Sequence, residues 1–254
     1  LRLLDRLYGL ARSIWLYHGV RGGRAAMDGF YAGFIRPGDL CFDIGAHAGS
    51  RTLSWSRLGA TVVALEPQPD FVRLLRWMFA GNPRVTVRNE AVAASAGTLR
   101  LLVSPRTPTV TTGSPAFISA ASRVSSFAWV RWSAELEVPT TTLDALIAQH
   151  GIPDFVKIDV EGMEHEVLAG LSRPIAAISF EFVPSALDSA LASLTRLERL
   201  APYRYNVALG ESLRLLFAAP IDAVALRAWL AQRAAESDSG DIYAILSPSD
   251  VAQS

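Results

Sequence analysis

The sequence predicts an α/β protein with a doubly wound, mostly parallel sheet and helices on both of its faces. Short apolar runs alternate with amphipathic helical segments along most of the chain, and a glycine-containing turn follows the first of these runs. Alternation of this kind predicts parallel strands that are joined by right-handed helical crossovers. The chain has 254 residues, half of them hydrophobic, so it can bury a full core.

The first part of the alternation follows two N-terminal helical segments, one at the start of the chain and one over 24–34. Strands are expected over 40–44, 61–66, 85–89 and 98–103, and helices over 51–58 and 69–80. A stretch rich in Ser, Thr, Pro and Ala then occupies 104–126. A loop of this length in a compact domain is either a functional lid or a disordered segment, and we predict that it covers the substrate side of the site.

The alternation resumes in the second part of the chain. Helices are expected over 142–150, 163–171 and 184–200, and strands over 154–160 and 175–182. The last two strands, over 203–209 and 240–246, flank a helix over 221–235 and extend the edge of the sheet, one of them antiparallel. We divide the chain into an N-terminal helical extension, 1–36, and one α/β domain, 37–254.

The net charge indicates which binding partners to expect, and the cysteine content indicates the cellular compartment. The 24 basic and 24 acidic residues give a formal net charge of zero, so no overall positive field attracts nucleic acid, and we expect no such partner. The single cysteine, Cys41, cannot form an intramolecular disulfide, which fits a reducing cytoplasm. Every apolar run is shorter than the roughly 20 residues of a membrane span, and the first residues show no signal-peptide pattern.

The first helical segment is amphipathic. Arg2, Arg6 and Arg12 lie away from its apolar face. That face consists of Leu3, Leu4, Leu7, Ala11, Ile14 and Trp15. We expect it to pack against the body of the protein, and the alternative is weak contact with a membrane surface.

The turn after the first strand begins the expected ligand site. In a doubly wound sheet, ligands bind beyond the carboxyl ends of the strands, where the strand order reverses. If the first strand is central, its turn meets Glu66 and Asp159 in one crevice. Gly45 and Gly49 allow a tight turn and a close approach of the backbone to a ligand, and Glu66 can accept two hydrogen bonds from a ribose diol. The alternative is that both glycines serve only the turn and that Glu66 is a solvated strand end.

His47 distinguishes between possible cofactors. A dinucleotide-binding fold has a glycine at this point, because the pyrophosphate lies against bare backbone and an imidazole would crowd it. S-adenosylmethionine has no pyrophosphate. It offers a ribose to Glu66 and an amino-acid group that can lie by the glycine turn near Asp43. These residues therefore favour S-adenosylmethionine over NAD.

Six segments between Gly38 and Leu246 carry a family resemblance: DIGAHAG, VVALEPQP, VTVRNEAVA, TTLDAL, FVKIDVEGMEHEVLAGL and GDIYAI. They resemble the FkbM-type methyltransferases, a branch of the class I fold that uses S-adenosylmethionine. The resemblance implies a seven-stranded, Rossmann-like sheet with this cofactor. It assigns the methionine side of the cofactor to the turn with Asp43, Gly45, Ala46, His47 and Gly49. It assigns the ribose to Glu66, and the surroundings of the adenine to Asn89 and Glu90.

A second group of charged residues lies in the strand predicted over 154–160. Lys157, Asp159 and Glu161 alternate, so their side chains point to one side until the chain turns. Charges in an apolar central strand are costly unless they are paired or used, and Lys157 is the only lysine among 24 basic residues. A buried ion pair with a helix-start acid is the structural interpretation. The functional one is a catalytic group of these three residues and Glu181 beside the methyl donor.

The most concrete function that the sequence supports is O-methylation of a sugar, a glycolipid or a secondary metabolite by S-adenosylmethionine. An NAD-linked oxidoreductase and a methyltransferase-like binding protein without catalysis are the alternatives. We expect no metal, although carboxylates such as Asp159, Glu161 and Glu181 suit magnesium.

Overall fold

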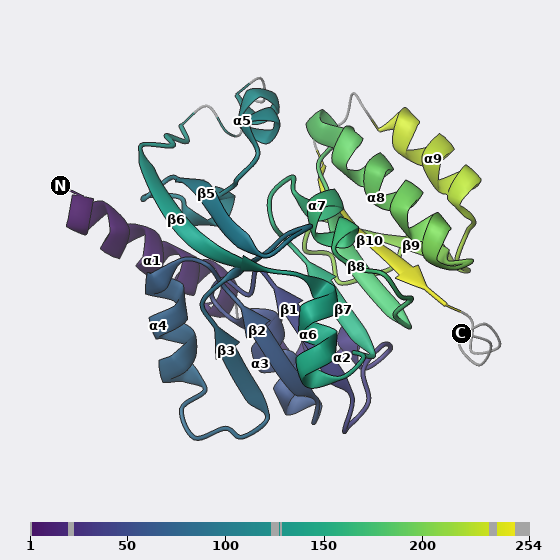
Figure 1. The fold of residues 1–254 in the computed structure, drawn as a ribbon, viewed down its shortest axis with the longest axis horizontal. Coiled ribbons are helices and arrows are strands. Elements are labelled where there is room, and N and C mark those ends of the chain that lie inside the picture. Colours follow the sequence, from purple (N-terminus) through teal and green to yellow (C-terminus); the bar gives the residue numbers. More distant parts are fainter. Residues whose placement is uncertain (1, 20–22, 123–126, 128, 234–237, 247–254) are drawn as a thin grey trace.

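The computed structural model describes residues 2–19, 23–122, 127, 129–233 and 238–246. Its centre is a seven-stranded sheet with the strand order β3-β2-β1-β7-β8-β10-β9 (Figure 1). The strands are β1 Leu40–Ile44, β2 Thr61–Leu65, β3 Val85–Arg88, β7 Phe155–Ile158, β8 Ala177–Phe182, β9 Arg204–Leu209 and β10 Gly240–Ile245. β10 is antiparallel to both of its neighbours, and the other pairings are parallel. The predicted fold class is confirmed.

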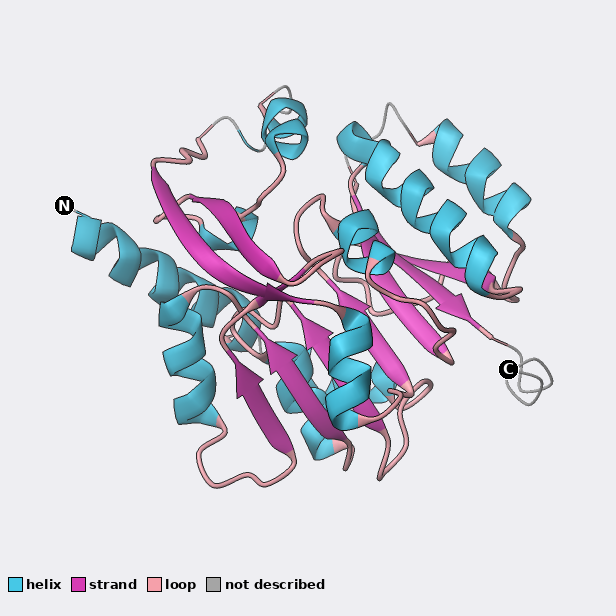
Figure 2. Ribbon diagram, viewed as in Figure 1, coloured by secondary structure: helices cyan, strands magenta, loops and turns pink. Residues whose placement is uncertain are grey.

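Helices cover both faces of this sheet (Figure 2). The helices are α1 Arg2–His18, α2 Gly23–Tyr31, α3 Ser50–Arg57, α4 Pro69–Met78, α5 Pro115–Ala121, α6 Leu143–His150, α7 Glu164–Ala169, α8 Leu187–Leu200 and α9 Ala223–Gln232, with 3-10 turns η1 Pro108–Val110 and η3 Pro184–Ala186. The larger core forms between one face of the sheet and α6 to α9. The opposite face carries α2, α3 and α4.

Local sequence signals explain where several of these helices begin. The Thr142 hydroxyl accepts a hydrogen bond from the backbone N–H of Ala145 at the start of α6. The carboxylate of Asp222 caps α9 in the same way. Such caps satisfy backbone N–H groups that have no partner inside the helix. They fix the residues at which α6 and α9 begin.

A second, three-stranded sheet stands beside the carboxyl ends of the parallel strands (Figure 1). It contains β4 Ala91–Val92, β5 Gly97–Val103 and β6 Ala134–Thr141, in the order β4-β6-β5. Only β5 was predicted. The strand β6 carries an alternating pattern in which Leu136 and Val138 pack in a small core while Glu135 and Glu137 are exposed. The Ser/Thr/Pro-rich stretch also contains η1 and α5, and its last residues, 123–126, lie outside the described residues.

The orientation of α1 contradicts one prediction. Its apolar face was expected to pack against the protein, but Leu4, Leu7 and Trp15 are exposed. The helix instead contacts the protein through Gly9 and Ser13, which are buried. The packing interpretation of the apolar face is therefore wrong. The division of the chain after residue 36 stays a prediction. Among the described residues, no helix is both long and apolar enough to cross a membrane.

Candidate active site

A cavity opens at the carboxyl ends of β1, β2 and β7. Its wall combines the turns after these strands with side chains of the small sheet and of η1. The predicted site residues that line it are Gly45, His47, Glu66, Glu90, Asp159 and Glu161. Sequence positions more than a hundred residues apart meet here because β1 lies between β2 and β7, as predicted.

Other predicted cofactor residues do not line this cavity, but they shape its wall. The Asp43 carboxylate accepts a hydrogen bond from the Thr52 hydroxyl in α3. The Asn89 side-chain amide donates to the carbonyl of Pro67 over 2.9 Å and to that of Glu66 over 3.2 Å. Both residues therefore hold the turns that carry the lining residues. Ala46 and Gly49 are buried within the glycine turn itself.

The glycine turn has an unusual backbone. Gly45, His47 and Gly49 have positive φ angles of 82°, 46° and 76°. A Cβ atom on residue 45 would lie 2.0 Å from the carbonyl oxygen of Asp159, so only glycine fits where the turns after β1 and β7 touch. The missing side chain brings the two turns into direct contact and leaves bare backbone in the cavity wall.

His47 is held by aromatic rings. The centroid of its imidazole lies 4.0 Å from that of the Phe71 ring and 5.3 Å from that of the Tyr17 ring. Its Nε2 atom is buried and has no hydrogen-bond partner among the described residues. Burial lowers the pKa of His47 to about 3, so the ring is neutral at physiological pH. Shape and its backbone N–H are what this residue contributes.

Glu66 closes the glycine turn from the neighbouring strand. Its Oε2 atom accepts a hydrogen bond from the backbone N–H of His47 over 2.9 Å, and its Oε1 atom accepts one from Gln68 over 2.7 Å. Each carboxylate oxygen can accept a second hydrogen bond, so the diol of a ribose can be bound as well. Burial raises the pKa of Glu66 to about 7. Together with the bare backbone at Gly45, this carboxylate fits S-adenosylmethionine.

Lys157 lies beneath the cavity, fully surrounded by protein. Its Nζ atom is 3.1 Å from Asp159 Oδ2 and 2.9 Å from Asp241 Oδ1. Burial disfavours the ammonium, but the attraction of the two carboxylates outweighs burial and raises the pKa of Lys157. Burial also opposes ionisation of Asp159, yet Lys157 and Arg51 outweigh it and lower the pKa of this carboxyl. Asp159 therefore faces the cavity as a carboxylate.

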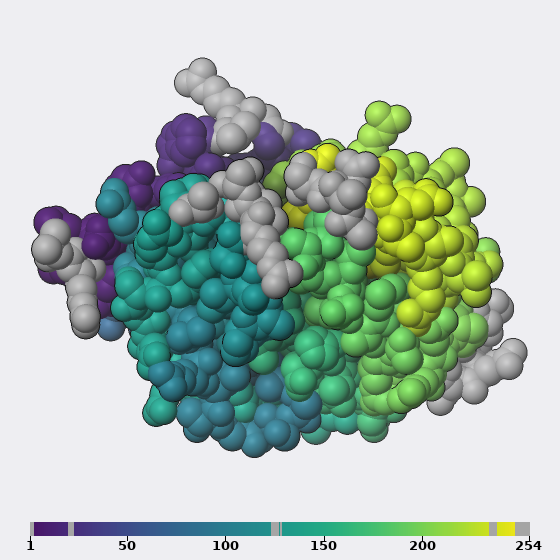
Figure 3. Space-filling view, turned by 90° about the horizontal axis from the view of Figure 1, so that it is seen from above, coloured from purple at the N-terminus to yellow at the C-terminus, as the bar shows by residue number. Residues whose placement is uncertain are grey.

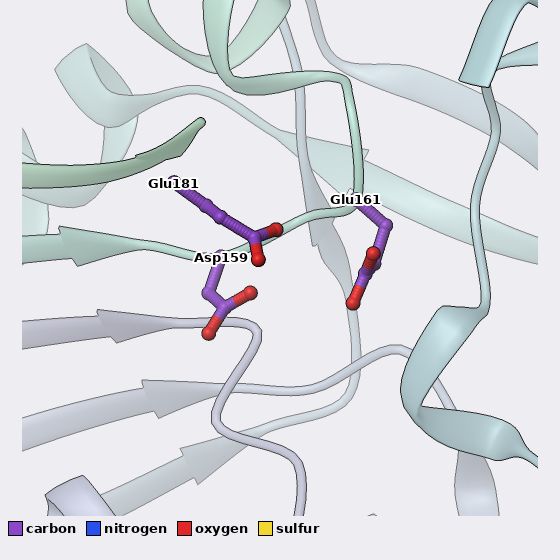
Figure 4. A group of neighbouring side chains, drawn as sticks. All are labelled: Asp159, Glu161 and Glu181. Atoms are coloured by element: carbon purple, nitrogen blue, oxygen red, sulfur yellow. The ribbon is translucent and has the colours of Figure 1, made fainter. Parts of the chain in front are cut away.

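The side chains of Asp159, Glu161 and Glu181 point toward one another (Figure 4). One oxygen atom from each lies within 4.8 Å of the others. We call these three residues the acidic group. Burial and repulsion by the neighbouring carboxylates raise the pKa values of Glu161 and Glu181. A group of this kind can share a proton or bind a divalent cation, and Glu181 reaches it from behind, where it lines a separate small cavity.

Sequence analysis missed three contributors to this site. Asp241 pairs with Lys157 from the antiparallel strand β10, and the signal was a charged residue inside the apolar segment GDIYAI. Glu164 is buried under the acidic group, where it accepts hydrogen bonds from the backbone of Gly162 and from the Ser189 hydroxyl. Arg51 is buried in α3 and pairs with Glu211 over 2.8 Å; no pattern in the sequence marked it.

The stretch over 104–126 contacts the acidic group directly. The Thr112 hydroxyl donates to the backbone carbonyl of Glu161 over 2.7 Å and accepts from the N–H of Ser114. Glu161 has a φ angle of 55°, which is unusual for a residue with a side chain. Thr112 therefore stabilises the backbone conformation that directs Glu161 into the acidic group.

We expect Thr112→Val to lower kcat about fivefold to tenfold, because the loss of this hydrogen bond frees the turn that positions Glu161. Steady-state kinetics and cofactor titration test this. Affinity for S-adenosylmethionine is expected to change little. Thr98→Val, at an exposed position of β5, is the matched control. Equal kcat values for the two variants would show that Thr112 has no positioning role.

Comparison with known proteins gives one family. The model of the methyltransferase FkbM domain matches residues 43–205. No curated protein matches this chain significantly. Similar solved structures include precorrin-6y C5,15-methyltransferase from Geobacter metallireducens, with 15% identity, a TM-score of 0.46 and 88% of each chain covered.

Two further similar structures are also methyltransferases. A putative O-methyltransferase from Klebsiella pneumoniae is 12% identical, with a TM-score of 0.45, and the match covers 96% of this chain and 89% of that one. Magnesium protoporphyrin IX methyltransferase from Synechocystis PCC 6803, solved with S-adenosylmethionine bound, is 13% identical, with a TM-score of 0.43 and coverages of 94% and 84%.

Proposed function

The chain belongs to the methyltransferase FkbM domain family, and on this premise we propose that it methylates a hydroxyl oxygen of a sugar, a glycolipid or a secondary metabolite. One observation carries the choice of oxygen. Asp159 and Glu161 of the acidic group line the same cavity as Gly45, His47 and Glu66, so an acceptor beside the cofactor meets carboxylates that can take up a hydroxyl proton.

S-adenosylmethionine, when bound, supplies a methyl group on a positively charged sulfur atom. Glu66 binds the ribose, and the turn from Asp43 to Gly49 binds the methionine side. Glu90 lines the cavity on the turn after β3, and the side chain of the adjacent Asn89 holds the turn that follows Glu66, so this end receives the adenine. With these assignments, the cofactor extends through the cavity from the small sheet to the acidic group.

The residues of the acidic group take different roles. Asp159 stays ionised because Lys157 neutralises it from below, so it orients the acceptor hydroxyl and does not need to bind a proton. Glu161 lines the cavity and has a raised pKa, which suits a general base. Glu181 lies behind Glu161, and the two carboxyl groups can share a proton. A positioned base contributes roughly 10²–10⁴ in rate.

The composition and the surface of the protein support proposals for its cellular location and its binding partners. We propose a cytoplasmic enzyme, because the one cysteine, Cys41, is buried and free. A small-molecule or glycan hydroxyl is the partner, and the balanced charge gives nucleic acid no general attraction. Weak contact with a membrane surface would be made by α1, whose apolar side chains are exposed.

The test is a product search with labelled cofactor. The protein is incubated with cell extract and S-adenosylmethionine that carries a deuterated methyl group, and tandem mass spectrometry finds the labelled product and the atom that bears the label. The Asp159→Asn variant serves as the inactive control. Label on oxygen is the expected result. Label on nitrogen or carbon would contradict the choice of oxygen, and no cofactor binding at all would favour a non-catalytic protein.

We expect methyl transfer to survive removal of divalent metals. Lys157 already supplies a cation to Asp159, and the raised pKa values of Glu161 and Glu181 mean that a proton reduces the repulsion within the acidic group. Initial rates after dialysis against EDTA, with and without added Mg²⁺, measure this. A loss of activity that Mg²⁺ restores would instead identify the acidic group as a metal site.

A further inference from the structure

The outer face of α1 is an apolar surface that the described part of the chain leaves uncovered. Leu3, Leu4, Leu7 and Trp15 are 65%, 69%, 54% and 69% exposed. Single exposed apolar residues are ordinary on protein surfaces, but large ones on successive turns of one helix form a patch. Burial of such a patch against another body is favourable by about 25 cal/mol per Å² of apolar area.

The orientation of α1 is fixed by its small residues. A Cβ atom on Gly9 would lie 2.2 Å from the carbonyl oxygen of Pro105, so the helix backbone packs directly on the chain before η1. Ser13, one turn further, is completely buried. At the end of the helix, His18 Nε2 donates to the carbonyl of Ala48 over 2.8 Å. The helix cannot turn its large side chains inward without losing these contacts.

Aromatic and basic side chains border the patch. The guanidinium of Arg12 lies 5.2 Å from the ring centroid of Trp129, and that of Arg106 lies 5.1 Å from the ring centroid of Tyr8. Both rings are about half exposed. Leucine at the centre, with tryptophan, tyrosine and arginine at the border, is the composition of helices that lie in the interface of a bilayer.

The charges around the patch distinguish between possible occupants. Ion pairs join Arg6 and Arg73 to Asp70, and Arg106 to Asp5. With Arg12, these are four basic residues against two acidic ones. A second copy of the chain would bring a like-charged border against this one, whereas an anionic surface complements it.

We propose that the outer face of α1 docks on an anionic lipid bilayer. Leu3, Leu4, Leu7 and Trp15 enter the boundary between headgroups and acyl chains, and Arg12 and Arg106 meet lipid phosphates. Docking does not require methyl transfer, so it stands or falls independently of the proposed function. It goes beyond weak contact, because it specifies the face, the sign of the lipid charge and the residues that enter the membrane.

The test is co-sedimentation with vesicles of equal parts phosphatidylglycerol and phosphatidylcholine, compared with phosphatidylcholine alone. The wild-type chain is expected in the pellet with the anionic vesicles and, for the most part, in the supernatant with the neutral ones. The double variant Leu4→Glu/Leu7→Glu should lower the partition coefficient at least about tenfold, because two inserted side chains become charged. Val224→Glu is the matched control and should bind like the wild type.

Val224 suits this comparison because it is 76% exposed on α9, and α1 and α9 lie at opposite ends of the molecule (Figure 3). All three substituted positions are exposed on helices, and circular dichroism and S-adenosylmethionine binding show whether each variant stays folded. Wild-type protein that remains in the supernatant with anionic vesicles would overturn the proposal. A second result would also overturn it: a wild-type dimer that the Leu4→Glu/Leu7→Glu variant dissociates, with no vesicle binding by any of the proteins. The outer face of α1 would then bind a second copy of the chain.

Discussion

Replacement of Glu66 by alanine is expected to weaken binding of S-adenosylmethionine at least about a hundredfold. The variant removes two acceptors for the ribose diol, and a hydrogen bond to a charged group contributes roughly 1.5–3 kcal/mol. It also removes the acceptors of the N–H groups of His47 and Gln68, which hold the glycine turn. Isothermal titration calorimetry measures the change in Kd.

The comparison for Glu66→Ala is His47→Ala, which changes the same wall of the cavity. The His47 ring contributes packing against Phe71 and Tyr17, and its buried Nε2 atom has no partner to lose among the described residues. We therefore expect a smaller loss of affinity from this variant. The opposite order would contradict the assignment of Glu66 to the ribose. Thermal unfolding of both variants separates loss of binding from loss of fold.

The raised pKa of Glu66 gives this binding a pH dependence. Burial raises its pKa to about 7, so the carboxyl is increasingly protonated as the pH falls below this value. A protonated carboxyl has fewer acceptor sites for the ribose, and affinity for the cofactor should therefore fall between about pH 7 and pH 5. The folding contribution has the opposite sign: the protonated form is favoured in the folded state, so this carboxyl reduces stability as the pH rises through 7.

The positions of the strand ends could be predicted from the sequence because they depend on local pattern. The apolar run before Gly45, and the acid at the end of the next run, Glu66, are visible without any tertiary information. The central place of the first strand then brings Asp159 to the same cavity, by the rule for doubly wound sheets. The alternation of side chains along a strand is also a local pattern, and it correctly placed Lys157 beside Asp159.

Two of the missed features depend on contacts between distant residues. Asp241 joins Lys157 across 84 residues, and its role arises only because β10 pairs antiparallel with β8. The orientation of α1 depends on Gly9 and Ser13, whereas an apolar stripe ordinarily indicates the buried face of a helix. A sequence pattern reports which residues share a face, but it does not report what that face meets.

Lys157 is the second residue whose replacement should have a large effect. It is 2% exposed, and its ammonium lies between Asp159 and Asp241. Lys157→Met would leave two carboxylates without their cation, and removal of one partner of a buried pair costs about 3–5 kcal/mol in the free energy of unfolding. Chemical denaturation of this variant measures that loss. Because such a variant can fail for lack of stability alone, it does not establish a role in catalysis.

The substitution Lys157→Arg tests that role, because it conserves the charge. Arginine presents a planar fork on a longer side chain, whereas the compact ammonium reaches Asp159 at 3.1 Å and Asp241 at 2.9 Å from one nitrogen atom. In this buried space the fork is expected to displace Asp159 from its position in the cavity wall. We expect the variant to fold and to bind S-adenosylmethionine, but to lose at least about tenfold in kcat, roughly 1.4 kcal/mol of transition-state stabilisation.

The matched control for Lys157→Arg is Asp241→Asn, which leaves the pair between Lys157 and Asp159 intact. Since Asp241 pairs with Lys157 and does not line the cavity, the kcat of Asp241→Asn should stay closer to that of the wild type. The pH dependence of kcat adds a readout that loss of stability does not move. Lys157 lowers the pKa of Asp159, so a displaced partner should shift the acidic limb of the profile upward. Full activity and an unchanged pH profile in Lys157→Arg would falsify the role of Lys157 in positioning Asp159. A positive charge at this position would then suffice for catalysis, whatever its exact geometry.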